Sequence, residues 1–158
     1  MSSQFLLRRN RQEAAVQFFV AHVNDARYYY SIRLLITHPS MPIEEITAAL
    51  GMEPSRAWNA GERHFAKNAM WGYSSWTEGK RLFFEEILDV LEWLEEQHEF
   101  VSRLRTSGGD FQVIAQLPGD INIGSVLSLE TMAIAVKLGV RIGVEVFPNL
   151  PRKVPDKD

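Results

Sequence analysis

Arginine, histidine and tryptophan gather in one short stretch of this chain, between residues 51 and 71. The side chains that offer chemistry there are Arg56, Trp58, Glu62, Arg63, His64 and Trp71. Guanidinium and imidazolium groups beside an indole ring hold anionic or planar ligands through charge-assisted hydrogen bonds and cation–π contacts. The stretch is therefore a candidate site for a small anionic ligand, either in a binding protein or in an enzyme. A structural role is the alternative, because tryptophans at such spacing usually pack in a core.

A second candidate site is a run of acidic side chains in a long predicted helix over residues 80–105. Seven carboxylates fall between residues 85 and 99, with no lysine or arginine among them. The expected partner-binding face consists of Glu85, Asp89, Glu92, Glu96 and Glu99. Like charges four residues apart on a helix repel by a few tenths of a kcal/mol per pair, so this face suits a basic protein partner. A solvated face that keeps the protein soluble is the alternative.

The sequence gives little support for metal or cofactor chemistry. The chain has no cysteine, and its four histidines lack the spacing of metal ligands. The pair Gly108-Gly109 follows a predicted helix and precedes a strand, which is the reverse of the order in a phosphate-binding loop. We therefore expect no catalytic residues, no metal and no cofactor, and the residues favour a binding protein over an enzyme.

The composition is that of one ordinary soluble domain. The 158 residues are 46% hydrophobic and 23% charged, with a formal net charge of −3. This balance argues against a protein that coats nucleic acid, and no apolar run approaches the roughly 20 residues of a membrane span. We expect a cytoplasmic protein with no nucleic-acid or membrane partner. Besides a basic protein, the remaining expected partner is a further copy of the chain, in a structural homo-oligomer.

The first 27 residues differ in composition from the rest of the chain. They begin with a basic arm that has no acidic residue before Glu13; its cations are Arg8, Arg9 and Arg11. Apolar residues at helical spacing then predict a helix over residues 12–23, although an alternating pattern there also fits a strand. Serine and arginine without acids are also typical of an organellar transit peptide. We favour a basic arm on a cytoplasmic protein.

Residues 28–148 have the pattern of a single α+β domain, and the proline-rich, charged residues 149–158 predict a flexible tail. Alternating apolar residues predict strands over 28–37, 69–76, 111–117 and 140–147, with a short strand within 53–64. Helices are predicted over 43–50, over 80–105 and between Ser128 and Gly139. A hairpin at the short strand requires antiparallel pairing. We therefore predict a mostly antiparallel sheet with helices packed on one face, in a ferredoxin-like β-α-β-β-α-β-α-β order.

Two apolar stripes are expected to enter the core of this fold. On the long helix, the stripe recurs at helical spacing and consists of Phe84, Ile87, Leu91, Leu94, His98 and Val101. On the last strand, the inner face alternates and consists of Val140, Ile142, Val144 and Val146.

One segment of the chain has a pattern typical of a known family. Residues 51–62 read Gly-Met-Glu-Pro-Ser-Arg-Ala-Trp-Asn-Ala-Gly-Glu, which resembles the G-x-x-P-[ST]-x-x-W-x-x-G-[ED] core of the bacterial family called domain of unknown function 4279. The Met70-Trp71 pair, the long helix and Leu138-Gly139-Val140 fit the same pattern, over roughly residues 28–148. The resemblance implies a small bacterial cytoplasmic α+β protein without an assigned activity. By fold-level analogy, neutralising a basic toxin, as an immunity protein does, is one instance of the interaction hypothesis.

Overall fold

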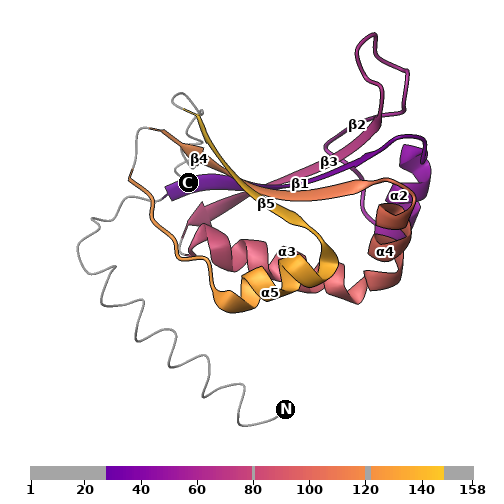
Figure 1. The fold of residues 1–158 in the computed structure, drawn as a ribbon. Helices are drawn as coiled ribbons and strands as arrows, with labels where there is room; N and C mark the ends of the chain where they lie inside the picture. The colour runs from indigo at the N-terminus through magenta and orange to yellow at the C-terminus, as the bar shows by residue number, and fades with distance from the viewer. Residues whose placement is uncertain (1–27, 80, 120–121, 148–158) are drawn as a thin grey trace.

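The computed structural model describes residues 28–79, 81–119 and 122–147. The predicted N-terminal helix over residues 12–23 and the predicted tail over residues 149–158 lie outside the described residues. The elements are β1 (Tyr28–His38), α2 (Ile43–Leu50), β2 (Arg56–Trp58), β3 (Ala69–Gly79), α3 (Phe83–Glu96), α4 (His98–Thr106), β4 (Asp110–Pro118), α5 (Leu129–Leu138) and β5 (Arg141–Phe147). Figure 1 shows α3, α4 and α5 along one face of the sheet, as predicted.

The five-stranded sheet is mixed, with the strand order β2-β3-β1-β4-β5. β1 runs antiparallel to both β3 and β4, and β2 runs antiparallel to β3, whereas β4 and β5 are parallel. Parallel pairing arises because α5 connects the two strands, and a helical crossover returns the chain to the end of the sheet from which it started. The α+β class is confirmed, but the predicted mostly antiparallel sheet of ferredoxin-like order is wrong.

Local sequence signals place several elements where they were predicted. β1 alternates, and its buried positions on the helix-facing side are Tyr30, Ile32, Leu34 and Ile36. α2 ends at Gly51, which adopts the left-handed conformation with φ of 66° and donates its backbone N–H to the carbonyl of Thr47. α5 begins at Ser128, whose hydroxyl accepts a hydrogen bond from the backbone N–H of Thr131. These three elements confirm the predicted strand and caps.

The predicted helix over residues 80–105 is in fact two helices. The chain leaves helical geometry at Gln97, where φ is −97° and ψ is 23°, and α4 begins at the next residue. This interruption changes which positions face the core, because residues after it no longer follow the periodicity of α3. His98, predicted in the buried stripe, is exposed, whereas the buried residues of the two helices are Phe83, Ile87, Leu91, Leu94, Phe100, Val101 and Leu104.

β5 is the second place where predicted core residues reach solvent. Val144 and Val146 are 47% and 62% exposed, although both were predicted on the inner face. They do lie on the helix-facing side, because they pair with Ala115 and Leu117 of β4, which are buried in the core. β5 is the edge strand, and the helix layer does not cover its second half. The apolar pattern of β5 therefore extends beyond the buried core.

Candidate functional site

The arginine–tryptophan hairpin, comprising β2, β3 and the residues between them, carries most of the first predicted site. The guanidinium carbons of Arg56 and Arg63 lie 5.3 Å and 4.3 Å from the ring centroid of Trp58. Both arginines are exposed, and the indole is half-buried. Each cation at such a distance is attracted by the negative face of the ring. The structure thus brings together three of the predicted residues, and their charges already have a partner within the chain.

Glu62 and His64 make separate contacts in the same hairpin. Glu62 Oε2 accepts a hydrogen bond of 2.7 Å from the backbone N–H of Asn59. Asn59 Oδ1 in turn accepts from the backbone N–H of Ile43, at the start of α2, at 3.0 Å. His64 packs edge-on against the exposed ring of Phe65, with centroids 4.7 Å apart. Sequence reasoning missed Asn59, a residue type that favours turns and helix N-termini and so gave a usable signal.

Trp71, the sixth predicted residue of the hairpin site, lies on the other face of the sheet. It pairs with Ala57, whereas Trp58 pairs with Met70, so the two tryptophans point to opposite sides. Trp71 is fully buried, and its Nε1–H donates a 3.0 Å hydrogen bond to the hydroxyl of Thr47. The structure therefore places Trp71 in the core beneath α2, away from the two arginines.

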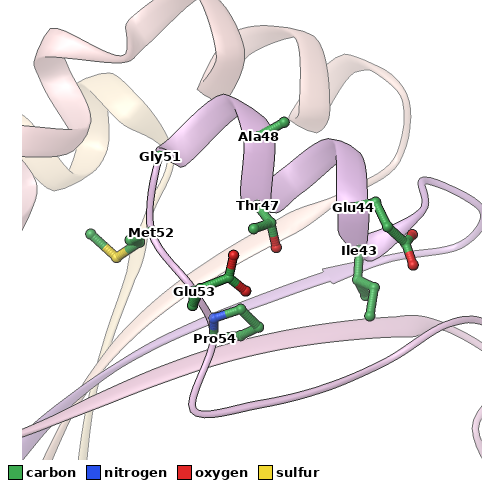
Figure 2. A pocket seen from close by; sticks show the side chains of 8 residues that line it. All are labelled: Ile43, Glu44, Thr47, Ala48, Gly51, Met52, Glu53 and Pro54. Carbon is green, nitrogen blue, oxygen red and sulfur yellow. The ribbon is translucent and has the colours of Figure 1, made fainter.

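A shallow cleft of about 590 Å³ lies beside α2 and the chain that follows it. Its lining residues, drawn in Figure 2, are Ile43, Glu44, Thr47, Ala48, Gly51, Met52, Glu53 and Pro54. The charged groups in this lining are the exposed carboxylates of Glu44 and Glu53. Carboxylates accept hydrogen bonds and attract cations, so the cleft is not suited to the anionic ligand expected near the hairpin.

The predicted acidic face is divided between two helices. Glu85, Asp89, Glu92 and Glu96 lie on α3, and Glu99 lies on α4, beyond the interruption at Gln97; all five are exposed. Sequence reasoning missed Arg81, which lies just before the run. Its guanidinium contacts Asp89 at 2.5 Å, and the hydrogen bond to this carboxylate raises the pKa of Arg81. The spacing of four residues between Arg81 and Glu85 was a signal for such a contact, and the pair lies 4.0 Å apart.

Glu92 lies among carboxylates from two helices. Partial desolvation raises the pKa of Glu92 above its ordinary value, and the nearby charges of Asp89, Glu130, Glu95 and Glu96 raise it further. Glu130 is on α5, so its nearness depends on the packing of α3 against α5 and could not be found in the sequence.

Neighbouring cations neutralise only part of this acidic group. Lys137 of α5 contacts Glu95 at 2.5 Å, and Arg81 contacts Asp89. The remaining carboxylates form no ion pair with any residue that the structure describes. We call these remaining residues, Glu92, Glu96 and Glu130, the acidic cluster. Within the described ranges of the chain, this cluster is therefore a group of like charges without an ion-paired cation, at the junction of α3 and α5.

An apolar cleft of about 250 Å³ opens on another flank of α3. It is lined by Ile32, Leu34, Met52, Tyr73, Ser75, Asp89, Val90 and Trp93. Tyr73 and Ser75 pair with Leu34 and Ile32, so the floor of the cleft is the helix-facing side of β3 and β1. Asp89 belongs both to this cleft and to the carboxylates that surround Glu92. The cleft therefore places an apolar depression next to a strongly acidic surface.

The side of the sheet away from the helices carries a polar network. Arg33 Nη2 donates to both carboxylate oxygens of Glu145, at 3.0 Å and 3.1 Å. Gln116 donates to Glu145 and accepts from the hydroxyl of Ser31. These groups hydrogen-bond across β1, β4 and β5, so the network joins the strands of the sheet. The buried Nε of Arg33 has no hydrogen-bond partner among the described residues.

The part of the chain that the structure describes shows neither a group of side chains arranged as a metal site nor a helix that could span a membrane. Its histidine, aspartate and glutamate side chains form no group of three or more arranged to hold a metal ion. Each described helix is too short or too polar to cross a bilayer.

Comparison with known proteins gives one match. A family model described as "Domain of unknown function (DUF4279)" matches residues 27–147, which span the fold from β1 to β5. No curated protein and no solved structure matches the chain. The match covers all the strands and helices that the structure describes, and the family description names no ligand, substrate or partner.

Proposed function

This chain belongs to the family described as domain of unknown function 4279, and from that premise we propose that it is a protein-interaction module. It binds a basic segment of another protein through the acidic cluster and the adjoining apolar cleft. The observation that carries the proposal is the environment of Glu92, where carboxylates from both α3 and α5 raise the pKa of its side chain and no ion pair to a described residue offsets them. An immunity protein that neutralises a basic toxin is one instance of such a module.

Electrostatics supports a cationic partner for this surface. A carboxylate whose pKa is raised by burial and by like charges is less stable when ionised than it is in water. An arginine or lysine brought beside Glu92 reverses this balance, because it supplies the opposite charge that the described part of the chain does not supply. Clustered charge of one sign also accelerates the approach of an oppositely charged partner.

The apolar cleft supports a more specific description of the partner. Protein interfaces usually depend on a few bulky side chains that fill pockets, surrounded by polar contacts that exclude water. The cleft beside Val90 and Trp93 offers such a pocket, and Asp89 lies at its border. We therefore expect the partner segment to carry a large apolar or aromatic residue flanked by arginine or lysine.

A second candidate function rests on the arginine–tryptophan hairpin. Arg56 and Arg63 are both exposed while they lie over one indole ring, and paired guanidinium groups bind carboxylate or phosphate well. An anionic ligand is therefore the alternative to a basic partner. We rank it second because the same guanidinium groups already contact Trp58.

A peptide titration tests the proposed function. The probe is a short peptide with a central tryptophan and two arginines on each side, and its dissociation constant is measured by calorimetry. Reversing both Glu92 and Glu96 to lysine should weaken binding at least tenfold. The matched control reverses Glu44 and Glu53, which changes the net charge equally but lies beside α2. The control should bind within about twofold of wild type.

Two results would contradict this proposal. Equal weakening by both double reversals would show that net charge, and no particular surface, attracts the peptide. Equal affinity for a second peptide, in which alanine replaces the tryptophan, would exclude a role for the apolar cleft. An inorganic phosphate titration, monitored through the indole fluorescence and repeated with Arg63→Ala, tests the hairpin alternative separately.

A further inference from the structure

A second apolar surface covers the outer side of α5 and the open half of β5. Its residues are Val126, Leu129, Met132 and Val136 in and just before α5, and Val144 and Val146 on the helix-facing side of β5, and we call it the α5–β5 apolar face. Leu129 and Val136 are each 82% exposed. Single exposed apolar residues are common on protein surfaces, but several of them on a helix and the edge strand that follows it are a candidate interaction surface.

The two flanks of α5 have different characters. Glu130 and Lys137, seven residues apart, lie toward α3, where they act on Glu92 and Glu95. The apolar residues of α5 are spaced by three and four and so form another flank of the helix: Leu129, Met132 and Val136. The α5–β5 apolar face is therefore separate from the acidic cluster.

We propose that residues 12–23 of the same chain cover the α5–β5 apolar face by packing on it as an amphipathic helix. In the sequence, this segment carries apolar residues at i, i+3, i+4 and i+7, namely Val16, Phe19, Val20 and Val23. No charged residue interrupts this stripe. Packing an apolar stripe without charges against an exposed apolar surface removes both from water, which is favourable.

The topology brings this segment to the right end of the sheet. β1 begins at Tyr28 and runs antiparallel to β4, and β4 is parallel to β5. The start of β1 therefore lies at the end of the sheet where β4 and β5 finish and where α5 begins. Figure 1 shows the start of β1, the ends of β4 and β5 and the start of α5 toward the left-hand side of the molecule.

The length of the linking residues 24–27 and the length of the proposed helix are also consistent with this placement. The start of β1 is two strand positions from β5 in the sheet order, which corresponds to about 10 Å. The four residues 24–27 extend to about 13 Å at most, which is enough to bring the segment to β5, the strand that borders the α5–β5 apolar face. A helix over residues 12–23 is about 18 Å long, and α5, with ten residues, is about 15 Å long.

The tether favours this segment over a second copy of the chain. A segment joined by four residues is present at an effective concentration in the millimolar range, whereas a second molecule must be supplied at that concentration to compete. The inference does not rest on the proposed function, because α5 presents the two surfaces on different flanks. Either one can fail while the other holds.

Amide hydrogen exchange on the full-length chain tests the inference. In wild type, the amides of residues 12–23 should exchange at least tenfold more slowly than in an unfolded peptide of that sequence. Leu129→Asp should abolish this protection and leave β1 and β4 protected. The substitution is suited to the test because Leu129 is exposed and an acid in the first turn of α5 complements the helix dipole.

A matched pair of variants in the segment separates apolar contact from charge. Phe19→Asp, within the stripe, should abolish the protection of residues 12–23. Ala14→Asp adds the same charge on the opposite side of the predicted helix and should preserve it. Exchange of wild-type residues 12–23 at the unfolded rate, protection that survives Leu129→Asp, or equal loss in the two variants would overturn the inference. So would a dimer whose dilution removes the protection, because the occupant would then come from a second copy.

Discussion

The arginine–tryptophan hairpin and the acidic cluster both carry several charged side chains, but the groups that surround those side chains differ between the two regions. In the hairpin, Trp58 contacts the guanidinium groups of Arg56 and Arg63, and Glu62 accepts a hydrogen bond from Asn59. In the cluster, the charged groups around Glu92 are mostly other carboxylates. A dense group of charges is thus a weak indicator of a binding surface by itself. What matters is whether the fold already supplies favourable contacts for the charged groups, as Trp58 does for the two arginines.

The largest effect that this comparison predicts separates the two tryptophans of the hairpin. Trp71→Ala should lower the free energy of unfolding by about 3–5 kcal/mol, because it leaves a cavity in the core and an unpartnered Thr47 hydroxyl. Trp58→Ala should cost about 1–2 kcal/mol, since it removes a half-buried ring and two cation–π contacts. Urea unfolding measures both. Equal losses would contradict the placement of the two rings on opposite faces.

A smaller effect tests whether the hairpin acts as a support for α2. Asn59→Ala should lower the free energy of unfolding by about 1 kcal/mol, because it removes the side chain that accepts from the N–H of Ile43. Glu62→Ala should cost less, since the carboxylate that it removes is exposed and, among the residues that the structure describes, hydrogen-bonds to Asn59 alone. Thermal unfolding followed by circular dichroism measures the two variants. A larger loss for Glu62→Ala would show that the turn, and not the α2 contact, dominates.

The smallest predicted effect has opposite signs in the acidic cluster and at the start of α2, the helix that the hairpin supports. Glu92→Gln should raise the free energy of unfolding at pH 7 by a few tenths of a kcal/mol, because it removes repulsion among like charges. Glu44→Gln, in the first turn of α2, should lower it by a similar amount, because a carboxylate there complements the helix dipole. Chemical unfolding of both variants beside wild type tests the signs. If both substitutions stabilise the fold, the cause is the change in net charge and not the position of each carboxylate.

The effect at Glu92 should also depend on pH in a defined direction. Its pKa is raised in the folded chain, so folding favours the protonated carboxyl group. Below its ordinary pKa of 4.5, Glu92 is protonated in both states and the variant has no advantage. As pH rises through the raised pKa of the folded state, wild type loses this relative stability and Glu92→Gln gains its full advantage. An advantage that grows toward acid pH would contradict the assignment.

Sequence patterns predicted those elements whose boundaries are local. The alternation of β1, the glycine that ends α2 and the Ser128 cap of α5 each depend on a few neighbouring residues, and all are present. The interruption at Gln97 was missed because neither proline nor glycine marks it. The parallel pairing of β5 was missed because the direction of the last strand depends on where α5 packs.

The candidate sites show the same division between local and tertiary information. Arg56 and Trp58 lie two positions apart on one short strand, so the sequence could name them together as candidates, although it did not predict that they contact each other. The burial of Trp71 depends on its register opposite Ala57, and the contribution of Glu130 to the acidic cluster depends on helix packing. Residues far apart in the sequence therefore defined the surface to which we assign the function. No pattern within α3 alone indicated that Glu92 lies at the centre of this surface.

The most direct test of the proposed interaction surface is a single neutral substitution measured in two ways. Glu92→Gln should unfold at a higher denaturant concentration than wild type and, in the same buffer at pH 7, bind the tryptophan–arginine peptide several-fold more weakly. Opposite changes in stability and affinity are expected only when the charge that destabilises the fold is the one that the partner uses. Unchanged or tighter binding by the stabilised variant would contradict our account.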